Sequence, residues 1–224
     1  MTYRKRTFFA FIVILALMGV AFIFGLRHPR QMALDASEAF DKNNGKSKKA
    51  LAGRSLLFVI APKNFRDEEL LTTKSILESK GVKATIASTT RDTVVGMLGA
   101  KVVPEKLISN VDLSKYDGVV FVGGSGTTML WDNRTAHKLA VEAKESGKIV
   151  AAICFGPVIL ARAGILKNCN ATVSPSVSEE IERYGAHYTG KPVAICGRII
   201  TANGPKSVEL FAEAIEKLLM QMEK

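Results

Sequence analysis

The chain has 224 residues, 47% of them hydrophobic, which suffices for one domain with a substantial core and is short for two full domains. Its formal charge of +10 is unevenly spread: residues 1–53 hold nine Lys and Arg against three acidic residues, and residues 54–224 hold 22 against 18. A nucleic-acid-binding domain carries its excess charge on the folded part and shows a groove-reading motif. Neither feature is present, so the composition argues against a nucleic-acid partner.

The cysteines and histidines are arranged unlike those of a metal centre. Cys154, Cys169 and Cys196 lack CxxC spacing, and three cysteines are too few for a disulfide-stabilised scaffold. At most one bridge can form, between Cys169 and Cys196. The three histidines are widely scattered, and no HExxH pattern occurs. We therefore expect no metal site, and the thiol chemistry considered below needs no cofactor.

The N-terminal region predicts a membrane anchor. Residues 7–26 are uncharged and mostly apolar, and as a helix at about 1.5 Å per residue they would span about 30 Å, the hydrocarbon thickness of a bilayer. Residues 1–6 form a basic n-region, but RHPR follows at 27–30, where a cleaved signal peptide has small residues. We therefore predict an uncleaved single-pass signal anchor with the following domain outside the cytoplasm. Polar residues 27–53 are predicted to be a flexible linker before a domain at 54–224.

From residue 54 onward, apolar strand-like runs alternate with segments of helical periodicity. Strands are predicted at Ser55–Ala61, Val82–Ala87, Gly118–Val122, Ile149–Ile153 and Ala171–Ser174, with a hairpin over Val193–Thr201 that turns at Gly197. Helices are predicted at Asp67–Lys80, between the loop after Val122 and about Ser146, from Gly156-Pro157 onward, and at Lys206–Met222. This order predicts an α/β domain with a mainly parallel sheet, helices on both faces, and a site at the carboxyl ends of the strands.

Cys154 lies between a predicted buried strand and the helix that opens at Gly156-Pro157. This is the position of a nucleophile elbow, a tight turn that exposes its side chain while the helix N-terminus favours thiolate over thiol. From position alone, a buried structural cysteine is the alternative.

A glycine pair follows another predicted strand. Gly123 and Gly124 would let backbone amides approach a bound oxygen, as an oxyanion pocket requires, although an ordinary tight loop is the alternative. The GGSG segment lacks GxGxxG spacing, which disfavours a dinucleotide-binding site.

Three acidic residues open the first helix. In a first turn such residues complement the helix dipole and face water, as we expect for Asp67 and Glu68. Glu69 differs in context, because the loops of such a sheet converge and can bring it near Cys154.

Several separated segments resemble the ThiJ/PfpI family in order and spacing. They are Phe65–Leu70, Asp117–Gly124, Ala151–Pro157, Gly185–Thr189 and Ile200–Pro205. The resemblance extends from about Ser55 to Leu219, essentially the whole predicted domain. It implies a flavodoxin-like sandwich related to class I glutamine amidotransferases that forms a homodimer or a higher homo-oligomer.

The resemblance also implies roles for individual residues. Cys154 matches the family's reactive cysteine, Glu69 the carboxyl that hydrogen-bonds it, and Gly123 and Gly124 the backbone-amide pocket, with Phe155 beside the cysteine. Members of the family include glyoxalases that convert methylglyoxal to lactate, deglycases, oxidation sensors, chaperones and peptidases.

Departures from the family's pattern reduce the number of these activities that the chain can be expected to have. Peptidase-like members follow the cysteine with His, whereas this chain has Phe155, and Ser174 stands where parkinsonism-linked members have a His near the cysteine. His187 matches a family histidine in a structural stretch. Without a neighbouring imidazole, amide hydrolysis has neither its base nor its leaving-group acid.

The leading hypothesis is a glyoxalase-like or deglycase-like enzyme of stress protection that acts on a small aldehyde. Cys154 would attack, the amides of Gly123 and Gly124 would hold the oxyanion, and Glu69 would shuttle the proton. A non-enzymatic oxidation sensor or chaperone is the second hypothesis, with an oxidant as its partner. A cysteine peptidase or amidase is the third, and an inactive binding domain held at the membrane is the last.

Overall fold

The structure is a computed structural model that describes residues 50–222. The predicted basic segment at 1–6, the membrane anchor at 7–26 and all but the end of the linker at 27–53 lie outside the described residues. Within the described part, no helix combines the length and the apolar character needed to cross a membrane.

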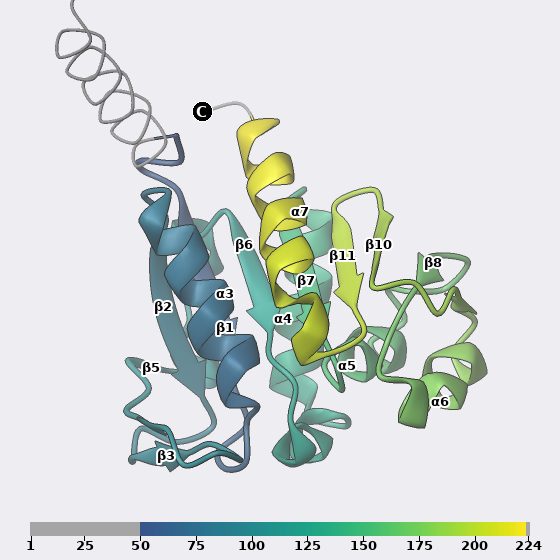
Figure 1. Cartoon of the computed structure of the whole chain (residues 1–224), viewed down its shortest axis with the longest axis horizontal. Helices are drawn as coiled ribbons and strands as arrows, with labels where there is room; N and C mark the ends of the chain where they lie inside the picture. The colour runs from purple at the N-terminus through teal and green to yellow at the C-terminus, as the bar shows by residue number, and fades with distance from the viewer. Residues whose placement is uncertain (1–49, 223–224) are drawn as a thin grey trace, which may run out of the picture. The chain divides into compact units, whose positions relative to one another are not determined.

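The centre of the domain is a seven-stranded sheet in the order β10-β11-β7-β6-β1-β2-β5 (Figure 1). Its strands are β1 (Ser55–Val59), β2 (Lys83–Ser88), β5 (Lys106–Leu107), β6 (Gly118–Phe121), β7 (Ile149–Ile153), β10 (Val193–Cys196) and β11 (Ile199–Ala202). All neighbours pair in parallel except β10 and β11, which form the antiparallel hairpin predicted around Gly197. The central strands β6 and β7 are buried along their whole length, as continuous apolar runs in a parallel sheet require.

Helices cover both faces of this sheet, which confirms the predicted flavodoxin-like α/β architecture. In Figure 1, α3 (Asp67–Ser79) and α7 (Val208–Met220) lie side by side in front of the sheet, and α4 (Arg134–Glu145) and α5 (Pro157–Arg162) lie behind it. Successive residues of β1 serve the two layers: Leu57 packs in the core with α4 and α5, and Phe58 packs in the core with α3 and α7. The period of two along a strand produces this alternation.

Several short elements were not predicted. They are the antiparallel pair β3 (Val94–Val95) and β4 (Lys101–Val102), the strand β5, the strand β9 (His187–Tyr188), which pairs with β8 (Asn170–Ala171), and the helix α6 (Ser178–Arg183). The strand predicted at Ala171–Ser174 is reduced to β8. Elements of two residues carry too little periodicity for a pattern to predict them.

Cys169 and Cys196 form a disulfide bond, the one pairing that the sequence left open. The bond joins the segment after α5 to the end of β10, at one edge of the sheet.

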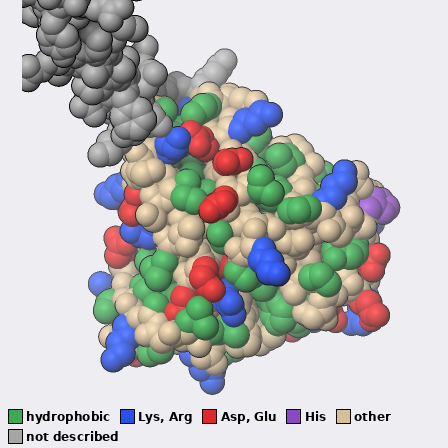
Figure 2. Space-filling model, in the orientation of Figure 1, with side chains coloured by type: hydrophobic (Ala, Val, Ile, Leu, Met, Phe, Trp, Pro, Cys, Tyr) green, Lys and Arg blue, Asp and Glu red, His purple; other side chains and the backbone are tan. Residues whose placement is uncertain are grey.

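Figure 2 shows the face that carries α3 and α7, where acidic and basic side chains are interspersed with hydrophobic ones. Charges of one sign do not gather on this face of the described part.

The register brings three strand ends to one edge. Val59 pairs with Phe121, and Phe121 pairs with Ala152, so the loops after β1, β6 and β7 leave the sheet together. Every residue predicted for the site lies on these loops or on the helices that follow them.

Candidate active site

Cys154 occupies a sharp turn directly after β7. Its φ of 61° is in the left-handed region, which residues other than glycine adopt rarely and only where the surroundings enforce it. Two hydrogen bonds hold the turn: the amide of Cys154 donates to the carbonyl of Ala202 at 2.9 Å, and its carbonyl accepts from the amide of Ser174 at 3.0 Å. The thiol is the free cysteine of the described residues and is half-buried.

Glu69 reaches this turn from the first turn of α3. It is fully buried, and its Oε2 accepts a hydrogen bond of 3.0 Å from the amide of Gly123. Its Oε1 has no nitrogen or oxygen partner within residues 50–222. The thiol of Cys154 forms a hydrogen bond with the carboxyl.

The two groups hold their protons unusually tightly. Burial raises the pKa of Glu69 to about 7, although its hydrogen bonds with Cys154 and Gly123 and the charge of Arg66 oppose this. Burial also raises the pKa of Cys154 to about 12, and the charge and hydrogen bond of Glu69 add to the rise. Two negative charges side by side in a dry site are unfavourable, so the pair retains at least one proton near neutral pH.

The expected preference for thiolate is therefore wrong for the resting site. The amides of Gly124 and Phe155 do lower the pKa of Cys154, but burial and Glu69 outweigh them. The helix that follows, α5, has six residues, and its dipole is correspondingly limited.

The glycine pair allows this close approach. A Cβ at Gly123 would lie 2.5 Å from Cβ of Cys154 and 2.5 Å from Oε2 of Glu69. Gly124 has φ 112°, and a Cβ there would meet the backbone of Asn64 and Arg66. The amide of Gly123 donates to Glu69, so the amides that face the sulfur are those of Gly124 and Phe155. Gly124 was predicted for this pocket, and Phe155 takes the place predicted for Gly123.

Phe155 turns its ring toward a residue that the sequence did not indicate. The rings of Phe155 and Trp131 are 5.9 Å apart at a tilt of 43°, and the indole Nε1 of Trp131 donates to the carbonyl of Phe155 at 3.1 Å. Trp131 thus fixes the peptide that follows the nucleophile. Its place in a polar loop more than twenty residues before Cys154 gave no sequence signal for this contact.

The remaining acids of the first turn of α3 differ from expectation in part. Asp67 does not face water: it is 5% exposed, and its carboxylate accepts from the amides of Leu98 and Ala100, each at 2.8 Å. Glu68 is partly exposed and pairs with Arg66 at 2.8 Å. Asp67 is buried because it accepts hydrogen bonds from the backbone of the 96–100 loop. The sequence around Asp67 carries no signal for this long-range contact.

The described histidines lie on other elements. The ring of His137 contacts the carbonyl of Trp131 at 2.6 Å, and His187 is exposed in β9. Ser174 meets the elbow through its amide, while its hydroxyl lies 3.0 Å from that of Ser176. Within the described chain the partners of the thiol are thus one carboxyl and two amides.

A single thiol on a strand-to-helix turn of a flavodoxin-like sheet, with a buried carboxyl beside it, defines a class of cysteine-elbow α/β proteins. The model of the DJ-1/PfpI family matches residues 54–218. The chain belongs to this family.

Known relatives agree with this assignment. An uncharacterised protein of Methanocaldococcus jannaschii is 42% identical over 182 residues, 78% of this chain and 89% of its own length. The glutathione-independent glyoxalase DJR-1.2 of Caenorhabditis elegans is 28% identical and covers 77% of this chain and 92% of its own. Deglycase PH1704 of Pyrococcus horikoshii is 29% identical, with 73% and 98% covered. Among solved structures, a ThiJ/PfpI domain protein from Brachyspira murdochii superposes with a TM-score of 0.75 at 37% identity, over 77% of this chain and 99% of its own.

Proposed function

We propose that this chain is an enzyme of the DJ-1/PfpI family that converts small α-oxoaldehydes to 2-hydroxy acids, tethered to a membrane by residues 7–26. The observation that carries the proposal is the buried carboxyl of Glu69, whose pKa is raised to about 7 beside the one free thiol of the described chain. A general base or acid works best when its pKa lies near the working pH. The relatives named as a glyoxalase and a deglycase support the same chemistry.

The first step joins the sulfur to the aldehyde. Ionised Glu69 takes the proton of the Cys154 thiol as the sulfur attacks the aldehyde carbon, and the carbonyl pair of electrons moves onto oxygen. The amides that face the sulfur, those of Gly124 and Phe155, are placed to donate to that oxygen. Glu69 then returns its proton to the oxygen, which leaves a neutral hemithioacetal.

The second step moves one proton between adjacent carbons. Glu69, again ionised, takes the proton from the carbon bound to sulfur and delivers it to the neighbouring carbonyl carbon. The hydroxyl proton of the first carbon passes to the oxygen of the second, so the hemithioacetal becomes the thioester of a 2-hydroxy acid. Water cleaves the thioester, releases the acid and restores the thiol. The sum is addition of one water molecule to the oxoaldehyde, so no external oxidant or reductant is consumed.

Methylglyoxal consumption and lactate formation test this proposal. We expect Cys154→Ser to abolish both, because the sulfur is the nucleophile, and Glu69→Gln to lower kcat/KM by at least about a hundredfold, the usual contribution of an acid–base group. Glu68→Gln is the matched control, since Glu68 lies on the same helix turn but pairs with Arg66. Wild-type protein that turns over no faster than Cys154→Ser would exclude the activity.

An oxidation sensor is the second candidate, favoured by the two amides that converge on a half-buried sulfur. Two peroxide molecules would convert the Cys154 thiol to a sulfinic acid with release of water, and these amides and Glu69 would hold its oxygens. Mass spectrometry after mild peroxide distinguishes the candidates: stable gain of two oxygens without turnover of methylglyoxal favours the sensor. A peptidase is disfavoured, because the contacts of the thiol include no imidazole.

The membrane tether and an extracytoplasmic domain belong to the same proposal. The disulfide Cys169–Cys196 supports this location, because such bonds persist mainly in oxidising compartments. Protease protection in inside-out membrane vesicles tests it. The domain should resist added protease while the vesicles are intact and should be digested once they are opened. A homodimer or higher oligomer, also proposed, is tested by light scattering on the protein in detergent.

A further inference from the structure

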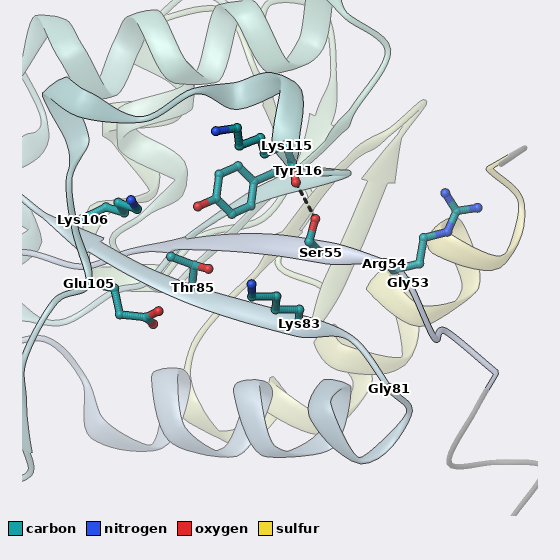
Figure 3. A pocket seen from close by; sticks show the side chains of 10 residues that line it. All are labelled: Gly53, Arg54, Ser55, Gly81, Lys83, Thr85, Glu105, Lys106, Lys115 and Tyr116. Atoms are coloured by element: carbon teal, nitrogen blue, oxygen red, sulfur yellow. Dashed lines mark hydrogen bonds between the residues drawn. The ribbon is translucent and has the colours of Figure 1, made fainter.

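A cavity away from the thiol site lies over β1, β2 and β5, on the face of the sheet that α4 and α5 cover elsewhere (Figure 3). Its volume is about 460 Å³, and its lining includes Ser55, Lys83, Thr85, Lys106, Lys115 and Tyr116. Cavities of this size accept small organic ligands. The lining shares no residue with the thiol site.

Four side chains of this lining offer hydrogen-bond donors that the protein does not use. Within residues 50–222, neither the ammonium groups of Lys83 and Lys106 nor the hydroxyls of Thr85 and Tyr116 make a hydrogen bond or ion pair. Thr85 is 5% exposed as a whole residue, and it belongs to the cavity lining. Figure 3 shows the hydroxyl of Tyr116 and the ammonium of Lys106 pointing toward one another across the cavity. Such a set of donors fits a ligand rich in acceptor oxygens.

The charges around the cavity leave it positive. Arg54 is already engaged, by Asp117 at 3.0 Å and by the carbonyl of Met222. Lys115 lies 3.5 Å from Asp112 at an exposed position. The carboxyl of Glu105, also in the lining, accepts from the amide of Ile86 at 3.1 Å.

The two free lysines therefore face a single carboxylate in the lining. The ligand that such a cavity favours is an anion. Ammonium groups bind phosphate as point charges, and hydroxyls donate to its remaining oxygens.

We propose that this cavity binds the phosphate group of a small phosphorylated polyol. The phosphate lies between the ammonium groups of Lys83 and Lys106 and accepts from the hydroxyls of Thr85 and Tyr116. A cavity of about 460 Å³ has room beyond a phosphate, which the polyol fills against the ring of Tyr116. Two sources share this chemistry: a soluble polyol phosphate and the glycerophosphate headgroup of an anionic lipid.

Calorimetric titration of the full chain in neutral detergent with glycerol 3-phosphate tests the proposal, with glycerol as the phosphate-free control. We expect binding of glycerol 3-phosphate alone. Lys83→Gln and Lys106→Gln should each weaken binding about tenfold, the effect of losing one charge-assisted hydrogen bond. Thr85→Val, which keeps the side-chain shape, should weaken it about threefold. Lys138→Gln is the matched control. This substitution removes the same charge from α4, at a position where the side chain is 72% exposed.

Binding to vesicles of phosphatidylglycerol, compared with phosphatidylcholine, identifies the source. Preference for phosphatidylglycerol that is lost in Lys83→Gln and Lys106→Gln assigns the lipid headgroup, and binding of soluble glycerol 3-phosphate alone assigns the free ligand. The proposal is overturned if neither probe binds, or if Lys138→Gln weakens binding as much as the cavity variants. The methylglyoxal reaction should be unchanged in all of these variants, so failure here and failure of the proposed enzyme are distinguishable.

Discussion

At the scale of single residues, Cys154 and Glu69 act as one titrating unit. The carboxyl is buried, with Oε2 held by the amide of Gly123, and it forms a hydrogen bond with the thiol. Burial raises the pKa of both groups, and the charge of Glu69 raises the pKa of Cys154 further, whereas the hydrogen bond with Cys154 lowers the pKa of Glu69. The resting site is therefore a thiol beside a carboxyl that changes its charge near neutral pH, and attack on a substrate begins with proton transfer inside the pair.

The burial of Glu69 makes the stability of the fold depend on pH. The pKa of Glu69 is raised from 4.5 to about 7 on folding. Its contribution to the free energy of unfolding is therefore fully present below pH 4.5 and is lost as pH rises through about 7. We expect the wild type to lose on the order of 3 kcal/mol of unfolding free energy relative to Glu69→Gln over this window. Urea unfolding of both proteins below pH 8 measures the difference without ionising Cys154. Parallel pH profiles for the two proteins would contradict it.

Gly123 is the position at which a single methyl group should separate the pair. A Cβ there would lie 2.5 Å from Cβ of Cys154, 2.5 Å from Oε2 of Glu69 and 2.8 Å from the carbonyl of Ile153. The first and last of these atoms are fixed by the backbone, and Oε2 is held by the amide of Gly123. Gly123→Ala should cost about 1 to 3 kcal/mol of unfolding free energy, as overpacking does, and should abolish turnover. In Gly164→Ala, the methyl group meets nothing within 4 Å and strains only the backbone, at φ 78°. This control should keep its activity; equal activity loss in both variants would rule out displacement of the pair as the cause.

At the scale of elements, the β3–β4 hairpin is held by a residue from a distant helix. The carboxylate of Asp67 accepts from the amides of Leu98 and Ala100, and the amide of Met97 donates to the carbonyl of Phe65 at 2.9 Å. The loop between the two strands is thus tied to the start of α3, the same helix turn that carries Glu69.

Asp67→Asn should loosen this hairpin. The variant keeps one acceptor oxygen but opposes an amide nitrogen to a backbone N–H, which costs about 1 to 3 kcal/mol. We expect faster hydrogen exchange at the amides of Leu98 and Ala100, with exchange in β7 unchanged. Asp92→Asn, which alters an exposed carboxylate hydrogen-bonded to Thr90, is the control. Unchanged exchange at both amides in Asp67→Asn would show that the carboxylate does not hold the loop.

The contrast between Asp67 and β7 shows what sequence could predict. Ile149–Ile153 is apolar throughout, and its bounds agree with the prediction, because burial on both faces imposes its composition. The elbow follows from that strand and from Gly156-Pro157. In α6, Ile181 is the only buried residue, so no apolar stripe marks the helix. Asp67 and Trp131 take their roles from tertiary contacts with loops and carbonyls far along the chain, which leave no local signal.

At the scale of the whole molecule, the excess positive charge lies toward the N-terminus, whereas the disulfide bond lies in the second half of the chain. The excess of basic residues is concentrated before residue 54, which accords with topology and lipid-surface roles more than with a charged folded surface. The only covalent cross-link of the described chain closes a separation of 27 residues between Cys169 and Cys196. It joins the edge hairpin to the segment behind the elbow, and therefore stabilises the end of the sheet opposite β5.

This cross-link gives a prediction about stability and compartment together. Closing a loop of 27 residues restricts the unfolded chain, and removing the bond in Cys196→Ser should lower the unfolding free energy by about 3 to 4 kcal/mol. Dithiothreitol should lower the stability of the wild type by a similar amount and leave Cys196→Ser unchanged, while the control Cys154→Ser, which keeps the bond, should respond like the wild type. Urea unfolding with and without reductant measures all three. Alkylation of free thiols in intact cells then reports the compartment: a protected Cys169–Cys196 pair is expected of an extracytoplasmic domain, and two alkylated cysteines beside a stable wild-type domain would place it in a reducing one.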